Sequence, residues 1–168
     1  MDESESDDSL YISLVSETER VPIILERIAQ FARRQGVFDS DGLLLVVREL
    51  LMNAIIHGNE SDPMRMALIR VAHRGAHFEV QVDDEGEGFD FESLTLGLPE
   101  DPQSLTKRGL VITHELSEEL SFERGGSRVR AIVDPGGRSP DPERGQYGFA
   151  GNKTTREEPC TSPMAKSV

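Results

Sequence analysis

The chain has 168 residues, of which 31 are acidic and 18 are basic, and its net charge is −13. This length suits one domain of ordinary size, and the negative charge opposes binding to the phosphate backbone of nucleic acid. One cysteine excludes an intrachain disulfide, no apolar run is long enough to cross a membrane, and the acidic start is unlike a signal peptide. Composition therefore predicts a cytoplasmic protein that binds neither nucleic acid nor membrane.

The two ends of the chain differ in composition from the middle. Residues 1–9 hold five acids and no base, which predicts a disordered leader because like charges repel. Residues 134–168 hold five of the nine prolines and five of the fifteen glycines without a helical or strand period, which predicts a disordered tail. We therefore expect one folded domain over residues 10–133.

Hydrophobic periodicity divides this middle part into helices and strands. In chain order we expect a strand over 10–15, a helix over 17–34, a helix from Asp39 or Ser40 to His57, strands over 65–73 and 77–83, a polar stretch over 84–106, a helix over about 108–116, and strands over 119–123 and 127–133. Helices come mainly first and antiparallel strands later. This order predicts an α/β (α+β) fold, a two-layer sandwich with helices on one face of a mixed, mainly antiparallel sheet.

The second helix is apolar nearly all round except for Glu49, Asn53 and His57. These three residues are spaced four apart, so at about 100° per residue they fall within roughly 80° of one another. A carboxylate on a buried helix needs a charged or hydrogen-bonding partner, which favours a polar cleft or a ligand. The alternative is a thin solvated face whose members pair with loop residues.

Two glycine-bearing segments follow the helix. In the first, Asp84 stands at the end of an apolar strand and precedes Gly86 and Gly88. The glycines would let the backbone approach a ligand to which Asp84 hydrogen-bonds, although such a turn can also simply reverse the chain. In the second, Lys107 and Arg108 precede a glycine at a helix start, which predicts an anion site or, alternatively, an ordinary basic loop.

Together and in this order, the three segments resemble the N, G1 and G2 boxes of the GHKL ATPase superfamily, which includes gyrase B, MutL and histidine kinases. The boxes are Glu49–Gly58, Asp84–Gly88 and Arg108–Leu110, with 31 residues from Asn53 to Asp84 and 25 from Asp84 to Gly109. The small size, the opening strand and helix, and the Asn-Ala-x-x-His-Gly form of the first box most resemble the anti-sigma-factor serine/threonine kinases of bacterial partner switching.

The resemblance implies a fold of the Bergerat type, with ATP between the N-box helix and a lid at residues 89–107. It implies that Glu49 is the general base, that Asn53 holds Mg²⁺, and that Asp84 accepts a hydrogen bond from the adenine amino group. His57 would support the helix end or the phosphate region, or serve only as a structural histidine. The remaining binding positions are Gly86 and Gly88, beside the base and the lid hinge, and the G2-box residues Lys107, Arg108, Gly109 and Leu110.

The resemblance also implies partners, namely a sigma factor and the antagonist protein that the kinase phosphorylates, and often a homodimer. Two departures favour slow turnover: Lys107 stands where the G2 box often has glycine, and residues 89–106 hold four acids and no base. One alternative is the ATP-binding module of a histidine kinase. Autophosphorylation in cis is disfavoured because no histidine precedes His57, which leaves a stand-alone module that acts on a histidine of another protein. The other is a nucleotide-gated interaction protein with little turnover.

Overall fold

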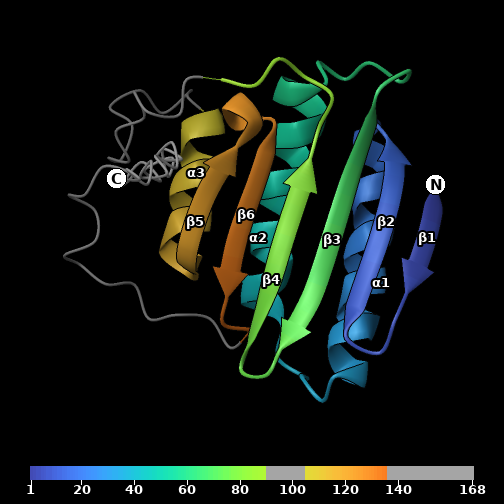
Figure 1. Ribbon diagram of the computed structural model, residues 1–168, viewed down its shortest axis with the longest axis vertical. Helices are drawn as coiled ribbons and strands as arrows, with labels where there is room; N and C mark the ends of the chain where they lie inside the picture. The colour runs from blue at the N-terminus through green and yellow to red at the C-terminus, as the bar shows by residue number, and fades with distance from the viewer. Residues whose placement is uncertain (90–104, 136–168) are drawn as a thin grey trace, which may run out of the picture.

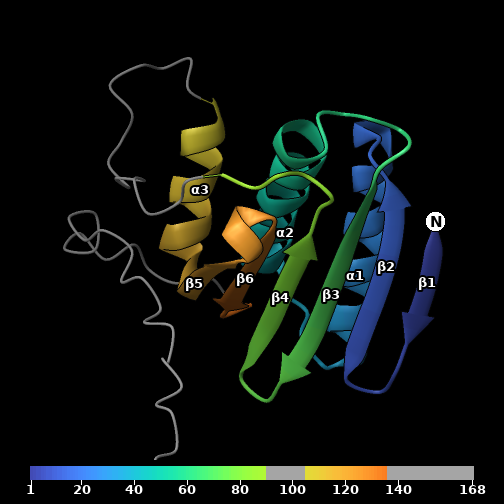
Figure 2. The same cartoon turned by 45° about the horizontal axis from the view of Figure 1, so that its top comes forward.

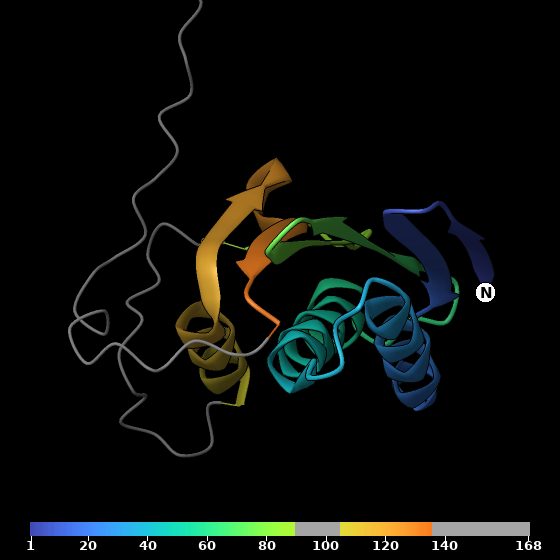
Figure 3. The same cartoon turned by 90° about the horizontal axis from the view of Figure 1, so that it is seen from below.

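The computed structural model describes residues 1–89 and 105–135, which form a six-stranded sheet with helices on one face (Figures 1 and 3). The strand order is β1-β2-β3-β4-β6-β5, and every pair in the described sheet is antiparallel. The strands are β1 (Asp2–Glu5), β2 (Ser9–Val15), β3 (Met66–Arg74), β4 (His77–Asp83), β5 (Ser117–Glu123) and β6 (Arg128–Val133).

The three α-helices within the described ranges lie on the same face of the sheet, as Figure 3 shows from below. Proline in the first turn of α1 and two arginines in its last turn are favourable at those ends. The helices and short helical turns are η1 (Thr18–Arg20), α1 (Val21–Arg34), α2 (Asp41–Asn53), the π-turn η2 (Ala54–Gly58), α3 (Leu105–Leu116) and η3 (Arg124–Gly126).

The predicted two-layer α+β architecture is confirmed, and the expected strands agree with the observed ones to within a few residues. Three helix boundaries differ. The helix expected over 17–34 is the 3-10 turn η1 followed by α1, which begins at Val21. The third helix begins at Leu105 and not at about Arg108, and the second helix ends in a π-turn after Asn53. None of the helices in the described ranges combines the length and the apolar character that a membrane span requires.

The expected disordered leader at residues 1–9 is wrong, because residues 2–5 form the edge strand β1 and Ser9 already belongs to β2. Repulsion among the acids is offset by arginines of α1. Arg27 lies 2.5 Å from a carboxylate oxygen of Glu3, and Arg34 lies 2.5 Å from one of Glu5. These cations are 24 and 29 residues away in sequence, so a local count of charges misses them.

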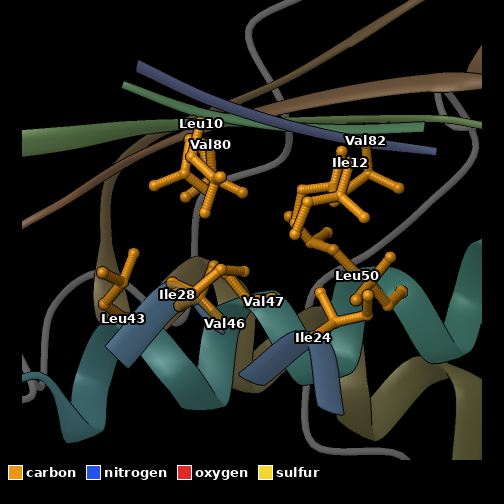
Figure 4. Close-up of a cluster of buried hydrophobic side chains, with 14 of the residues drawn as sticks. Leu10, Ile12, Ile24, Ile28, Leu43, Val46, Val47, Leu50, Val80 and Val82 are labelled. Carbon is orange, nitrogen blue, oxygen red and sulfur yellow. The ribbon is translucent and has the colours of Figure 1, made fainter. Parts of the chain in front are cut away.

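The core lies between the sheet and the helices α1 and α2. In Figure 4, Leu10, Ile12, Val80 and Val82 of the sheet face side chains of the two helices. Leu43, Val46, Val47 and Leu50 come from α2, and Ile24 and Ile28 from α1. This packing buries one side of α2 and thereby fixes the direction in which its remaining polar residues point.

Two predictions fall wholly or largely outside the described residues. These are the disordered tail, of which only residues 134 and 135 are described, and the lid at residues 89–107, of which only its two ends are described.

Candidate functional site

Glu49 and Asn53 lie one turn apart on α2, which is α-helical through Asn53 as predicted. Helix α2 contacts α3, and Figure 2 shows the two helices side by side. The glycine at position 109 of α3 makes this approach possible, since a Cβ built there would lie 2.6 Å from Glu49 Oε2 and 3.8 Å from Asn53 Nδ2. The tertiary structure therefore places Gly109 next to Glu49 and Asn53, two other residues of the predicted site.

The Glu49 carboxylate is mostly buried, with 15 % of its side chain exposed. Arg48 Nη1 forms an ion pair with Glu49 Oε1, while Oε2 faces Gly109. The pair was not expected from the sequence, because neighbouring residues on a helix usually point in different directions. One oxygen of this carboxylate is thus held by a cation, and the other lies beside α3.

Asn53 carries a buried polar atom without a partner. Its Nδ2 is inaccessible to solvent and donates no hydrogen bond in the structure. An unpaired buried amide lowers the stability of the fold by about 1–3 kcal/mol. Such a group therefore needs an explanation, and a bound ligand, ion or water molecule supplies one. Asn53 is therefore the residue that most directly indicates a binding function at the α2–α3 contact.

His57 does not lie on the same helix face as Glu49 and Asn53, with which the sequence spacing aligns it. It lies in the π-turn η2, whose wider winding changes its direction relative to Asn53, and its side chain is exposed. The arc of about 80° expected for Glu49, Asn53 and His57 assumes an unbroken α-helix. The structure therefore keeps Glu49 and Asn53 together and places His57 at the solvent side of the helix end.

Asp84 lies at the other end of the same helix, against η2. A Cβ at Gly58 would be 2.3 Å from Asp84 Cγ, and a Cβ at Gly86 would be 2.2 Å from the Gly58 carbonyl oxygen. The Gly86 N–H donates to Asp84 Oδ1 at 2.8 Å. Side chains at either glycine would displace the carboxylate or the backbone, so the two glycines and Asp84 form one interlocked unit.

Burial raises the pKa of Asp84 above its ordinary value, since the carboxylate loses water contact. The hydrogen bond from Gly86 works in the opposite direction, the neighbouring charge of Asp83 raises the pKa further, and Arg65 lowers it. The net shift is upward. The folded protein thus carries a carboxylate whose ionised form is disfavoured, which is a common property of ligand-binding groups.

We predict that Asp84→Asn stabilises the ligand-free protein at neutral pH by about 0.5–1 kcal/mol, or a few degrees in melting temperature, with partial exposure limiting the gain. A raised folded-state pKa means that the folded state binds more protons than the unfolded state, so stability falls as pH rises from about 4 through that pKa. Asparagine removes this loss and still accepts from Gly86. Thermal melts from pH 3.5 to 8 measure the difference.

The matched control is Glu87→Gln, which removes an exposed charge from the same turn. It should leave the melting temperature nearly unchanged. An Asp84→Asn protein that melts below the parent at pH 7 would contradict the proposed cost of burying this carboxylate.

Asn59 is a site residue that the sequence reasoning missed, because Gly58-Asn59, directly after the expected helix end at His57, predicts only a helix stop. The residue is fully buried. Its Oδ1 accepts the N–H of Glu85 at 2.7 Å, and its Nδ2 donates to Ser16 Oγ at 2.7 Å and to the Met66 carbonyl at 2.9 Å. Nothing in the local pattern distinguishes such an asparagine from an ordinary C-terminal residue of a helix.

The other glycine of the first turn, Gly88, contacts a different element. A Cβ there would lie 2.0 Å from the carbonyl oxygen of Gly125 in η3, and its φ of +78° also favours glycine. The next residue, Phe89, donates its N–H to the same carbonyl at 2.9 Å. Gly88 therefore fastens the segment that follows β4 to the β5–β6 turn, and it lies apart from the Gly58–Gly86 unit.

The remaining predicted residues lie in the first half of α3. Lys107 and Arg108 belong to its first turn, and their side chains lie outside the described part of the structure. Leu110 is buried and packs with Phe122 of β5, so its side chain anchors α3 to the sheet. Of the G2-box residues whose surroundings the structure describes, Gly109 lies against Glu49 and Asn53.

The site residues are thus arranged along one helix. From Glu49 to Gly58 there are nine residues, which at 1.5 Å each span about 13 Å. Asp84 and Gly86 meet the Gly58 end, and Gly109 meets the Glu49–Asn53 end. A separate depression of about 590 Å³ lies over the strands and includes Asp84 and Glu85 in its lining, but it includes neither Glu49 nor Asn53. A ligand that contacts both ends of the helix must be elongated.

A family model for the histidine kinase-like ATPase domain matches residues 14–133, which run from the end of β2 to the end of β6 and include α1, α2 and α3. This chain therefore belongs to the histidine kinase-like ATPase family, and these residues form its ATP-binding domain. Comparison with curated proteins gave no match. The family assignment agrees with the fold and explains why an elongated ligand suits the helix α2–η2.

The residues at the α2–α3 contact fit Mg²⁺ bound together with phosphates. The described residues contain no group of three His, Cys, Asp or Glu side chains that could hold a metal ion by themselves. Mg²⁺ is commonly held by one or two protein oxygens plus substrate phosphates. The Asn53 amide supplies one such oxygen when its side chain is rotated by half a turn about its last bond, which puts Oδ1 where the unpartnered Nδ2 lies.

Proposed function

We propose that this chain is an ATP-dependent protein serine/threonine kinase that binds a sigma factor in one state and phosphorylates a small antagonist protein in another. The observation that carries the proposal is the close approach of Gly109 to Glu49 and Asn53, since a Cβ at Gly109 would lie 2.6 Å from Glu49 Oε2 and 3.8 Å from Asn53 Nδ2. It joins a carboxylate, an unpartnered amide and a close backbone approach at one point. Phosphoryl transfer needs these elements: a base, a phosphate-binding group and room for the phosphates.

In this proposal, adenine lies at the Asp84 end of the helix and the triphosphate at the Glu49 end. The amide of Asn53 would hold Mg²⁺, which when bound neutralises charge on the phosphates. Asp84 Oδ2 accepts a hydrogen bond from the adenine amino group, since Oδ1 already accepts from Gly86. Helix α3, with Lys107 and Arg108 in its first turn, adds positive potential at the phosphate end.

Glu49 would act as the general base. Its carboxylate takes the proton of a serine or threonine hydroxyl of the antagonist protein as that oxygen bonds to the γ-phosphorus. The bond from the γ-phosphorus to the β–γ bridging oxygen breaks, and ADP leaves with the electron pair. The partial burial of the carboxylate supports this role, because a base works best where water does not compete for the same oxygen.

Nucleotide binding is tested by thermal shift with the full chain and MgATP, MgADP or MgGTP. We expect ATP and ADP to raise the melting temperature, since a ligand at one hundred times its dissociation constant stabilises by about 2.7 kcal/mol. GTP should have little effect, because guanine has a carbonyl where adenine has its amino group. Absence of any response to adenine nucleotides would remove the basis of the proposal.

Phosphoryl transfer is tested with labelled ATP and a panel of small antagonist proteins. Acid-stable phosphate on the product supports transfer to serine or threonine. Acid-labile phosphate would favour the stand-alone histidine-kinase-like module instead. Tight nucleotide binding without transfer or hydrolysis in the presence of every partner would favour the nucleotide-gated interaction protein.

A further inference from the structure

We propose that Asn59 is a positioning residue that orients the Asp84 carboxylate and thereby sets the preference of the site for adenine over guanine. This inference rests on the proposed function, because it concerns how the same site selects its nucleotide. Asn59 itself is buried and is placed to act through its neighbour Asp84.

The Asn59 side chain makes three hydrogen bonds, two through Nδ2 and one through Oδ1. Nδ2 donates to Ser16 Oγ at the end of β2 and to the Met66 carbonyl at the start of β3, and Oδ1 accepts from Glu85 N–H after β4. A rotated amide would set donor against donor at Glu85 and acceptor against acceptor at Met66. The orientation of the side chain is therefore determined by its surroundings, with Oδ1 directed at the turn that carries Asp84.

The bond from Glu85 reaches Asp84 through the backbone. The Glu85 N–H belongs to the peptide group that joins Asp84 to Glu85, so Asn59 holds one side of Asp84. The Asp84 N–H donates to the Ser127 carbonyl at 3.0 Å and holds the other side. With both peptide groups fixed, the Gly86 N–H can select one carboxylate oxygen, Oδ1. Oδ2 then remains for a ligand.

Asn59 is itself fixed to the helix that bears the phosphate-binding residues. Its backbone N–H donates to the Ala54 carbonyl at 2.8 Å, which is a bond of the π-turn η2. The π-turn thus delivers an asparagine side chain into the interior immediately after Gly58, the residue against which the Asp84 carboxylate rests. Asn59 therefore connects the turn that carries Asp84 directly to the segment that carries Glu49. The distance between the two ends of the site is thus set by the continuous segment from residue 49 to residue 59.

Other bonds keep the surrounding strands together without Asn59. Met66 N–H donates to Glu85 Oε2 at 2.7 Å, and Ser16 Oγ donates to the Arg65 carbonyl at 3.1 Å. Strand β2 also pairs with β3 along its whole length. None of these bonds holds the backbone amide of Glu85 in position, whereas Asn59 does. A carboxylate that can turn will accept from adenine less well and will reject guanine less strictly.

The test compares Asn59→Ala with Ser16→Ala in the full chain. Both changes remove a hydrogen bond from the same buried network, but only Asn59→Ala removes the bond to Glu85. Dissociation constants for MgATP and MgGTP are measured by titration calorimetry. We expect Asn59→Ala to lower the GTP-to-ATP ratio of dissociation constants by about tenfold, chiefly through weaker ATP binding. Ser16→Ala should keep the parental ratio.

Two further variants keep the test decisive. Asn59→Asp retains the acceptor for Glu85 but sets an oxygen against the Met66 carbonyl, so the folded variant should be less stable than the parent and yet retain most of the preference for ATP. If Asn59→Ala does not fold, Asn59→Ser replaces it, since serine keeps a hydroxyl but is one bond too short to reach Glu85. A folded Asn59→Ala or Asn59→Ser protein with the parental ratio overturns the inference, as does the failure of both to fold. A parent that binds no adenine nucleotide instead refutes the proposed function.

Discussion

Replacing Glu49 with Gln should slow phosphoryl transfer from ATP by about 10²–10⁴-fold while the protein still binds MgATP. Glutamine keeps the size of the side chain and its contact with Gly109, but it cannot take a proton from the attacking hydroxyl. The loss should appear in single-turnover measurements with saturating MgATP, in which substrate binding does not limit the rate.

The control for this variant is its own thermal shift. The MgATP-induced rise in melting temperature should remain close to that of the parent, because the proposal assigns adenine recognition to Asp84 at the opposite end of the helix. A Glu49→Gln protein that transfers phosphate as fast as the parent would exclude Glu49 as the base. Loss of both binding and transfer would instead show that the charge of Glu49, paired with Arg48, organises the site.

Replacing Gly109 with Ala should give a protein that is at least as stable as the parent but transfers phosphate about 10²-fold more slowly. The added Cβ would lie 2.6 Å from Glu49 Oε2, which is too close for contact. That oxygen is the far end of a flexible side chain, so it can move aside without disturbing the helices. Displacing a reacting group by about 1 Å is enough for a loss of this size.

Stability should not fall, because alanine is favoured over glycine within a helix by about 1 kcal/mol. The matched control is Gly75→Asn in the β3–β4 turn, where nothing lies within 4 Å of an added Cβ and where asparagine tolerates the positive φ. It should leave transfer unchanged. A Gly109→Ala protein with parental activity would mean that the Glu49 carboxylate does not work in the position that the structure gives it.

The two variants test different parts of one arrangement. Glu49→Gln removes the chemistry and leaves the geometry, whereas Gly109→Ala leaves the carboxylate and displaces it. If Glu49 is the base, both proteins bind MgATP and both are slow. A slow Gly109→Ala beside a fully active Glu49→Gln would instead assign the function of Gly109 to phosphate approach at Asn53, which lies 3.8 Å from the added Cβ.

Sequence periodicity was sufficient for features that depend on a single element. The spacing of Glu49 and Asn53 places them on one face of any α-helix, and the apolar residues around them require that the rest of α2 is buried. For His57 the same reasoning predicts the wrong position, because the helix widens into a π-turn after Asn53. A change from α to π winding depends on what the following residues bond to, and here Asn59 is held from β2, β3 and the turn after β4.

By itself, the sequence determined which face of the second helix is polar, which turns must be glycine-rich, and the order of helices and strands, since each follows from local periodicity and backbone sterics. Only the tertiary structure decided that the acidic start becomes β1, that Gly109 meets Glu49, and that Asn59 holds the turn beside Asp84. These three outcomes depend on partners 24 to 60 residues away in the chain, such as Arg27 for Glu3 and Glu85 for Asn59. A buried hydrogen bond or an ion pair between distant residues produces no periodic pattern in the sequence, because the packing of the sheet against the helices determines which residues meet.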